Sequence, residues 1–208
     1  MPSNNTNDTK TSKQQSLTET VSEEKKTLEG ELEHEFSSEK EKEEGTDNKE
    51  VYHVYILQRV VQETKRICKL ADPKEALGIL LGYKYTYKGK RYVKVVDWVT
   101  GHAYQSHAYA EFTPKGVQQY TSIIQEKYGD CETRPRIVGI FHSHPFGTNP
   151  SFSSTDYGTF LNFPYDAEYN VFVLIDPRAK YYKSYIVVKD DEGRKGLQEV
   201  DWVEYTVK

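Results

Sequence analysis

Two histidines separated by a single residue, His142 and His144, close an apolar run that begins at Ile137. Alternate side chains of a β-strand point to the same face, so a strand over this run would project both imidazoles together. Two neutral imidazole nitrogens on one face can bind one divalent metal ion. A histidine at a strand end is more often only hydrogen-bonded or exposed. The pair therefore predicts a metal site only in the company of a further ligand.

Asp156 is the third ligand that the sequence offers. It follows a polar loop that is long enough to fold back beside the histidines, and a hydroxyl such as that of Ser153 can cap a helix there. Two imidazoles and one carboxylate leave the fourth position of a tetrahedral zinc site open, which is typical of a catalytic zinc. Cys68 and Cys131 are too dispersed to form another site. We therefore expect one Zn²⁺ per chain.

A catalytic zinc site also needs a base that does not bind the metal, and Glu75 is the candidate. It lies between the Asp72-Pro73 step and the apolar run 76–82. A carboxylate at the edge of an apolar core can acquire a pKa that suits proton transfer. The alternative on local grounds is a solvated cap residue, because glutamate is usually exposed.

These residues together resemble a known family, the JAMM (MPN+) zinc metalloproteases. The similarity is carried by three motifs, which are Glu75-x-x-Gly78-x-x-x-Gly82, His142-Ser143-His144-Pro145 and Ser153-x-x-Asp156. The family includes the proteasome-lid and signalosome isopeptidases and their archaeal relatives, and the motifs fall in order across residues 52–189. The resemblance implies a cytidine-deaminase-like fold of three layers.

The resemblance also implies a role for each matched residue. The zinc ligands would be His142, His144 and Asp156. Glu75 would be the general acid/base in contact with the zinc water, and Ser153 would stabilise the tetrahedral oxyanion. The implied substrates are conjugates of a ubiquitin-like or small sulfur-carrier-type modifier, cleaved after the C-terminal Gly-Gly of the modifier.

The chain departs from the family pattern in one interval, and one rival function stays open. The spacing from His144 to Ser153 is one residue longer than is usual, so Ser151 and Ser154 are alternatives for the serine role. The rival is a non-catalytic MPN scaffold that binds partners in a larger complex, although a scaffold has no reason to keep the complete ligand set with Glu75. A deaminase on a similar fold would need H-x-E and P-C-x-x-C motifs, and the sequence contains neither.

The elements that must position these residues follow from apolar periodicity and turn signals. We expect helices over residues 51–70, 114–128 and 153–163, and strands over 76–82, 83–99 with a turn at Lys88-Gly89, 136–144, 170–176, 181–189 and 200–207. Helices and strands that alternate in this way indicate a mixed central β-sheet flanked by helices, which is an α/β or α+β layered domain.

The composition changes at about residue 50. Residues 1–50 carry 14 acidic and 7 basic side chains and no Tyr or Trp, so they offer too little apolar surface to form a core. We expect a disordered acidic tail over 1–50 and the metalloprotease domain over 51–208. Apolar residues within 17–36 recur at helical spacing, which leaves docking of this segment on a partner as an alternative to a solvated tail.

Charge and hydropathy restrict the partners and the location. Residues 51–208 hold 21 basic and 18 acidic side chains, a balance that does not indicate nucleic-acid binding. No apolar run in the sequence approaches the length of a bilayer span. Two dispersed cysteines make no disulfide framework. We therefore expect a cytoplasmic protein that acts on protein conjugates and binds neither nucleic acid nor membranes.

Deletion of residues 1–50 should leave the zinc content and the melting temperature almost unchanged, because the segment supplies few apolar side chains to a core. Both quantities are measured on the truncated and the full-length chain. A truncated chain that no longer folds would contradict the predicted boundary. A changed kcat/KM on a small conjugate, with folding intact, would favour docking of the segment 17–36 over a solvated tail.

Overall fold

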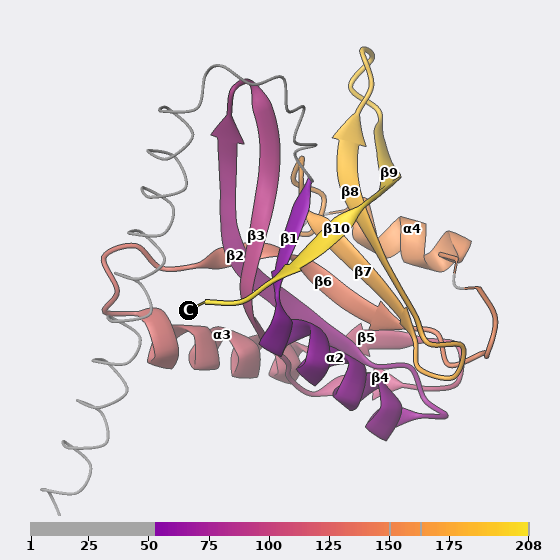
Figure 1. The fold of residues 1–208 in the computed structure, drawn as a ribbon. Coiled ribbons are helices and arrows are strands. Elements are labelled where there is room, and N and C mark those ends of the chain that lie inside the picture. Colours follow the sequence, from indigo (N-terminus) through magenta and orange to yellow (C-terminus); the bar gives the residue numbers. More distant parts are fainter. Residues whose placement is uncertain (1–52, 150, 163, 208) are drawn as a thin grey trace, which may run out of the picture. The chain divides into compact units, whose positions relative to one another are not determined.

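The computed structural model describes residues 53–149, 151–162 and 164–207. The predictions for the tail 1–50, for its segment 17–36 and for a domain start at residue 51 therefore lie outside the described residues. The elements in chain order are β1 (Val54–Leu57), α2 (Gln58–Ala71), β2 (Leu77–Tyr87), β3 (Lys90–Val99), β4 (Ala103–Gln105), β5 (Ala110–Phe112), α3 (Pro114–Tyr128), β6 (Arg136–Ser143), α4 (Ser154–Phe160), β7 (Val171–Asp176), β8 (Tyr181–Lys189), β9 (Lys195–Val200) and β10 (Trp202–Tyr205) (Figure 1). Among these elements no helix is both long and apolar enough to cross a bilayer.

Eight of the strands form one mixed sheet in the order β10-β1-β3-β2-β6-β7-β8-β9. Strand β1 runs parallel to both β10 and β3, and β6 runs parallel to β7, while the other neighbours are antiparallel. Strands β4 and β5 pair separately as a short antiparallel hairpin. The middle of the large sheet is therefore made by β2 and β6. Glu75 precedes β2, Gly78 and Gly82 lie within it, and the two histidines lie at the end of β6.

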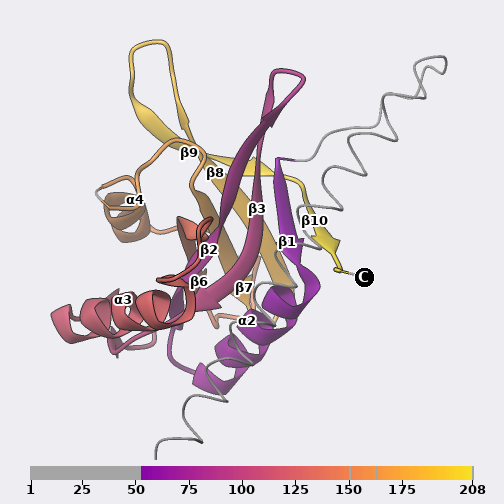
Figure 2. The same cartoon turned by 90° about the vertical axis from the view of Figure 1, so that its left-hand side faces the viewer.

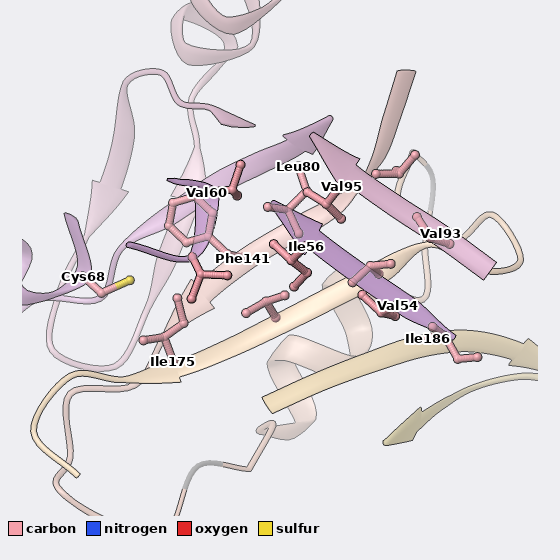
Figure 3. Close-up of a cluster of buried hydrophobic side chains, with 14 of the residues drawn as sticks. Val54, Ile56, Val60, Cys68, Leu80, Val93, Val95, Phe141, Ile175 and Ile186 are labelled. Carbon is pink, nitrogen blue, oxygen red and sulfur yellow. The ribbon is translucent and has the colours of Figure 1, made fainter. Parts of the chain in front are cut away.

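Helices cover both faces of the large sheet, with α2 on one side and α3 and α4 on the other (Figure 2). Each face has its own buried cluster. Under α2, Val60 and Cys68 pack on strand residues that include Ile56, Leu80 and Phe141 (Figure 3). The opposite cluster contains Tyr120 of α3 and Phe160 of α4 with Ile79, Ile140, Phe172 and Leu174 of the strands. The expected mixed sheet between helical layers is confirmed.

Local sequence signals account for most of the elements. The predicted helix over 114–128 is confirmed as α3, because Thr113 caps it by accepting a hydrogen bond from the Gly116 amide at 3.1 Å and Pro114 stands at the first helical position. The turn at Lys88-Gly89 and the strands β6, β7 and β8 also lie where they were predicted. The region predicted as strands over 76–82 and 83–99 forms two strands, since β2 continues from Leu77 to Tyr87 and β3 follows the turn.

Two predictions of local structure are wrong at the ends of the domain, and one hairpin in the polar connection was not predicted. The helix expected over 51–70 begins only at Gln58, because Val54 and Ile56 bury alternate side chains in a strand that pairs with two neighbours. The segment expected over 200–207 is divided at Asp201 into the end of β9 and the whole of β10. The hairpin β4–β5 was not predicted, since its strands are three residues each and lack a clear alternation.

The two glycines of the first motif are required by close packing. A Cβ on Gly78 would lie 2.1 Å from the Phe141 ring, and a Cβ on Gly82 would lie 2.1 Å from the Lys94 carbonyl oxygen. Both glycines therefore allow β2 to pack tightly in the centre of the sheet, beside the strand that carries the histidines.

Candidate metal centre

Strand β6 delivers both histidines to one buried end of the sheet. His142 lies within β6 between Leu77 of β2 and Leu174 of β7, and the His144 amide donates a hydrogen bond to the Ile175 carbonyl at 2.9 Å. The two histidines are 2% and 5% exposed, and their ring centroids are 4.9 Å apart. The structure thus brings the two imidazoles together.

Asp156 reaches the histidines from the first turn of α4. Ser153 caps this helix: its hydroxyl oxygen accepts a hydrogen bond from the Asp156 amide at 3.2 Å, and the Asp156 carboxylate accepts one from the Ser153 amide at 2.7 Å. This capping box fixes the direction of the carboxylate. Asp156 Oδ1 lies 3.5 Å from His142 Nε2, and Oδ2 lies 3.3 Å from His144 Nε2.

Glu75 reaches the same histidines from the segment that precedes β2. The residue is only 2% exposed, which is incompatible with a solvated cap. Its Oε2 lies 3.2 Å from His142 Nε2, and its Oε1 lies 3.8 Å from His144 Nε2. The nearest ligand atoms of Glu75, His142 and His144 all lie within 4.8 Å of one another, so this group could hold a metal ion.

The separations between these donor atoms suit a tetrahedral metal ion. Ligand atoms at about 2.0–2.1 Å from zinc, with tetrahedral angles between them, are about 3.3–3.4 Å apart. The four carboxylate–imidazole separations, 3.2, 3.3, 3.5 and 3.8 Å, lie around this distance. These separations use a different oxygen of each carboxylate for each imidazole, and the group whose single ligand atoms all lie within 4.8 Å of one another is Glu75, His142 and His144, with Asp156 beside it.

The hydrogen bonding of His142 also fits a bound cation. Both of its ring nitrogens are buried, and neither has a hydrogen-bond partner among the described residues. Leaving a buried polar atom unsatisfied costs about 1–3 kcal/mol. A metal ion on Nε2 would satisfy one of these atoms and would neutralise charge on the nearby buried carboxylates. The side chains present therefore fit a divalent metal ion.

Two buried groups, the Asp156 carboxyl and the Cys68 thiol, have pKa values that differ from the usual ones in opposite directions. Burial acts to raise the pKa of Asp156, but hydrogen bonding to His144, the proximity of His142 and two hydrogen bonds from Ser153 lower it to about 2. Asp156 is therefore an anion at neutral pH. Burial raises the pKa of the Cys68 thiol to about 12, so Cys68 is neither a thiolate nucleophile nor a thiolate ligand at neutral pH.

Ser153 contacts the centre through Asp156. Its hydroxyl donates to Asp156 Oδ2 at 2.8 Å while it accepts from the Asp156 amide. A hydroxyl has one proton to donate, so Ser153 can stabilise an oxyanion only after that proton turns away from Asp156. Ser151, Ser153 and Ser154 are all exposed, so exposure does not distinguish the three serines. Among the described residues, Ser153 is the candidate serine that hydrogen-bonds to a candidate ligand.

Two contacts that position Glu75 were not expected from the sequence. Ser143, which lies between the two histidines, is fully buried; its amide donates to the Ala76 carbonyl at 2.9 Å and its Oγ accepts from the Ala76 amide at 2.7 Å. The Glu75 amide donates to the carbonyl of Ser106, in the β4–β5 connection, at 2.8 Å. These pairings depend on the tertiary fold, and no spacing in the sequence signals them.

The chain is similar to known proteins over most of this domain. A family model of prokaryotic homologs of the JAB domain matches residues 57–177, a range that contains all the candidate residues of the centre. Among solved structures, the solution structure of protein DSY2949 from Desulfitobacterium hafniense has 22% sequence identity and a TM-score of 0.45. That similarity covers 74% of this chain and 94% of the other. No curated protein matches the chain.

Asp156→Ala should abolish stoichiometric metal binding, because it removes an anionic ligand and half of the capping box that orients α4. Metal content is measured on purified, zinc-reconstituted protein, where the unsubstituted chain should hold one zinc ion. Thr155→Ala is the control, since this exposed neighbour lies in the same helical turn. A variant that retains one tightly bound zinc would show that Asp156 is not a ligand.

Proposed function

The chain belongs to the family of prokaryotic homologs of the JAB domain, as its motifs indicate, and from that premise we propose that it is a zinc-dependent isopeptidase or peptidase. Its proposed substrates are conjugates of a ubiquitin-like or sulfur-carrier-type modifier, which it would hydrolyse after the C-terminal Gly-Gly. The observation that carries the proposal is a buried carboxylate, Glu75, that faces the histidine pair in addition to the carboxylate of Asp156. One carboxylate can serve as a ligand and the other can transfer protons.

His142, His144 and Asp156 would hold the metal ion. Zinc in this position would acidify a water molecule and polarise the carbonyl of the scissile bond. The histidines offer imidazole nitrogens on the same side of strand β6, and Asp156 offers an anion whose direction is fixed by the cap of α4. These three side chains need little movement to bind, because their donor atoms already lie within 3.5 Å of a neighbouring donor.

Glu75 would move the protons. Its carboxylate would accept a proton from the attacking water and return it to the leaving amine, which needs the proton to depart as a neutral group. Glu75 suits this role because its backbone is fixed from both sides, by Ser106 through its own amide and by Ser143 through Ala76. A base that is held in place loses less conformational entropy when it reaches the geometry of reaction.

Ser153 would act on the carbonyl oxygen of the substrate. In the structure its hydroxyl proton is directed to Asp156. When Asp156 binds a cation, its oxygens become poorer acceptors, and the hydroxyl can turn to a developing oxyanion. The same side chain would thus orient a metal ligand at rest and stabilise charge during the reaction.

The second candidate function is a non-catalytic MPN scaffold, and one observation favours it. Glu75 lies as close to His142 as Asp156 lies to His144, at 3.2 and 3.3 Å. If Glu75 were a fourth ligand, the site would be closed, and closed zinc sites are structural. The two functions therefore differ in one measurable property, which is whether Glu75 contributes to metal affinity.

The remaining expectations stay predictions. We propose one zinc ion per chain, a cytoplasmic location, and protein conjugates as partners in preference to nucleic acids or membranes.

Glu75→Gln should keep zinc and lose turnover by roughly 10²–10⁴-fold, because the amide keeps the shape of the side chain but cannot accept a proton. The measurements are zinc affinity and kcat on a conjugate joined through a Gly-Gly tail. Glu199→Gln, a change on the exposed side of β9, is the control and should alter neither. A large loss of zinc affinity in Glu75→Gln would instead identify Glu75 as a ligand and favour the scaffold.

Ser153→Ala should lower kcat by roughly 10²–10³-fold, the usual effect of removing one oxyanion donor. It should also lower the melting temperature slightly, because a helix cap contributes about 1 kcal/mol. Ser154→Ala, at the first residue of α4, is the matched control and should change kcat little. A larger loss of kcat in Ser154→Ala than in Ser153→Ala would transfer the serine role to Ser154.

A further inference from the structure

A buried carboxylate outside the motifs anchors the turn that follows β7. Asp176, the last residue of β7, is fully buried. Its Oδ2 accepts hydrogen bonds from the amides of Gly147 and Thr148, at 2.8 and 3.1 Å. Its Oδ1 accepts from the amides of Arg178 and Ala179, at 2.8 and 2.9 Å. Four backbone donors therefore converge on one side chain.

The bonds to Oδ2 act on the loop that joins His144 to the rest of the candidate centre. Gly147 and Thr148 are the third and fourth residues after His144, whose own amide is bonded to Ile175, the neighbour of Asp176. The end of β7 therefore holds this segment at three backbone amides, that of the candidate ligand His144 and those of Gly147 and Thr148. A carboxylate suits the task because each oxygen has two acceptor sites, whereas an asparagine has only one acceptor oxygen.

The same turn also contacts the segment of Glu75. The Nε of Arg178 donates to both carboxylate oxygens of Asp72, at 3.0 Å each, and its Nη2 donates to Oδ1 at 2.5 Å. Asp72 lies three residues before Glu75. Hydrogen bonding from Arg178 lowers the pKa of Asp72. An exposed ion pair adds little stability, but a forked guanidinium–carboxylate pair fixes direction.

We propose that Asp176 is a positioning residue for the metal centre, and that Arg178 extends its action to the segment of Glu75. One turn then sets the distance between the loop after His144 and the segment of the base, which are far apart in the sequence. This inference rests on the proposed function, since it concerns the geometry of that same site. Among the described residues, the hydrogen bonds and ion pairs of Asp176 and Arg178 do not include either histidine, so both residues act through the backbone segments that they hold.

The test compares Asp176→Asn with Asp97→Asn. Asp97 is a matched control because it is also a buried aspartate, 2% exposed, but it accepts hydrogen bonds from Lys127 and Tyr128 and so holds α3 against β3. Three quantities are measured: amide hydrogen exchange of metal-free protein over 144–149, the absorption spectrum of bound Co²⁺, and kcat. The first two need no turnover.

Asp176→Asn should speed exchange over 144–149 by about 10-fold or more, as expected when charge-assisted hydrogen bonds that close a loop are lost. It should also change the Co²⁺ spectrum and lower kcat, whereas Asp97→Asn should lower the melting temperature and leave these three quantities unchanged. Equal effects of the two substitutions would overturn the inference. Faster exchange with an unchanged Co²⁺ spectrum and kcat would overturn it as well, because the loop would then be ordered without consequence for the centre.

Arg178→Gln provides a second test that leaves the buried carboxylate in place. It should speed exchange over residues 72–76 and lower kcat while zinc affinity stays unchanged, since the candidate ligands lie on other segments. Unchanged exchange and kcat would refute the role of Arg178. A protein that binds metal but cleaves no Gly-Gly conjugate would refute the proposed reaction, and the exchange and Co²⁺ comparisons would still decide the inference.

Discussion

Burying four ionisable side chains at one point is the constraint on which this domain depends. Glu75, His142, His144 and Asp156 are each less than a tenth exposed, and both carboxylates lie within 4 Å of both imidazoles. Buried carboxylates are costly to ionise unless a cation compensates their charge. A divalent metal ion would provide the compensating charge and would also satisfy an imidazole nitrogen that has no hydrogen-bond partner among the described residues. The four side chains of the centre are thus suited to a ligand of positive charge.

The fold meets this constraint by fixing the backbone segments that carry the four side chains, and this fixes the positions of the side chains. β6 is fixed between β2 and β7, so the two histidines inherit the rigidity of the sheet. Ser143 bonds twice to the backbone of Ala76 and thereby ties the histidine strand to the segment of Glu75. The capping box of α4 fixes the direction of the Asp156 carboxylate. Rigid placement of this kind limits the reorganisation that a reaction would require.

The sequence predicts the parts of this centre that depend on local chemistry. Strand alternation predicts the shared direction of His142 and His144, and the serine before Asp156 predicts the helix start that carries it. Burial of Glu75 could not be read locally, because it arises from strands that pair across the chain. For the same reason the sequence did not predict strand β1, because its apolar spacing also fits a helix. It did not predict the role of Asp176 either, because the four hydrogen-bond partners of Asp176 are set by the tertiary fold.

We propose that His142, His144 and Asp156 bind one metal ion through nitrogen and oxygen atoms. X-ray absorption of the zinc-loaded protein tests it most directly. The account predicts one zinc per chain with a first shell of nitrogen and oxygen at about 2.0–2.1 Å and the outer-shell scattering of two imidazoles. A shell that contains sulfur at about 2.3 Å, or a protein that takes up no stoichiometric zinc, would contradict it.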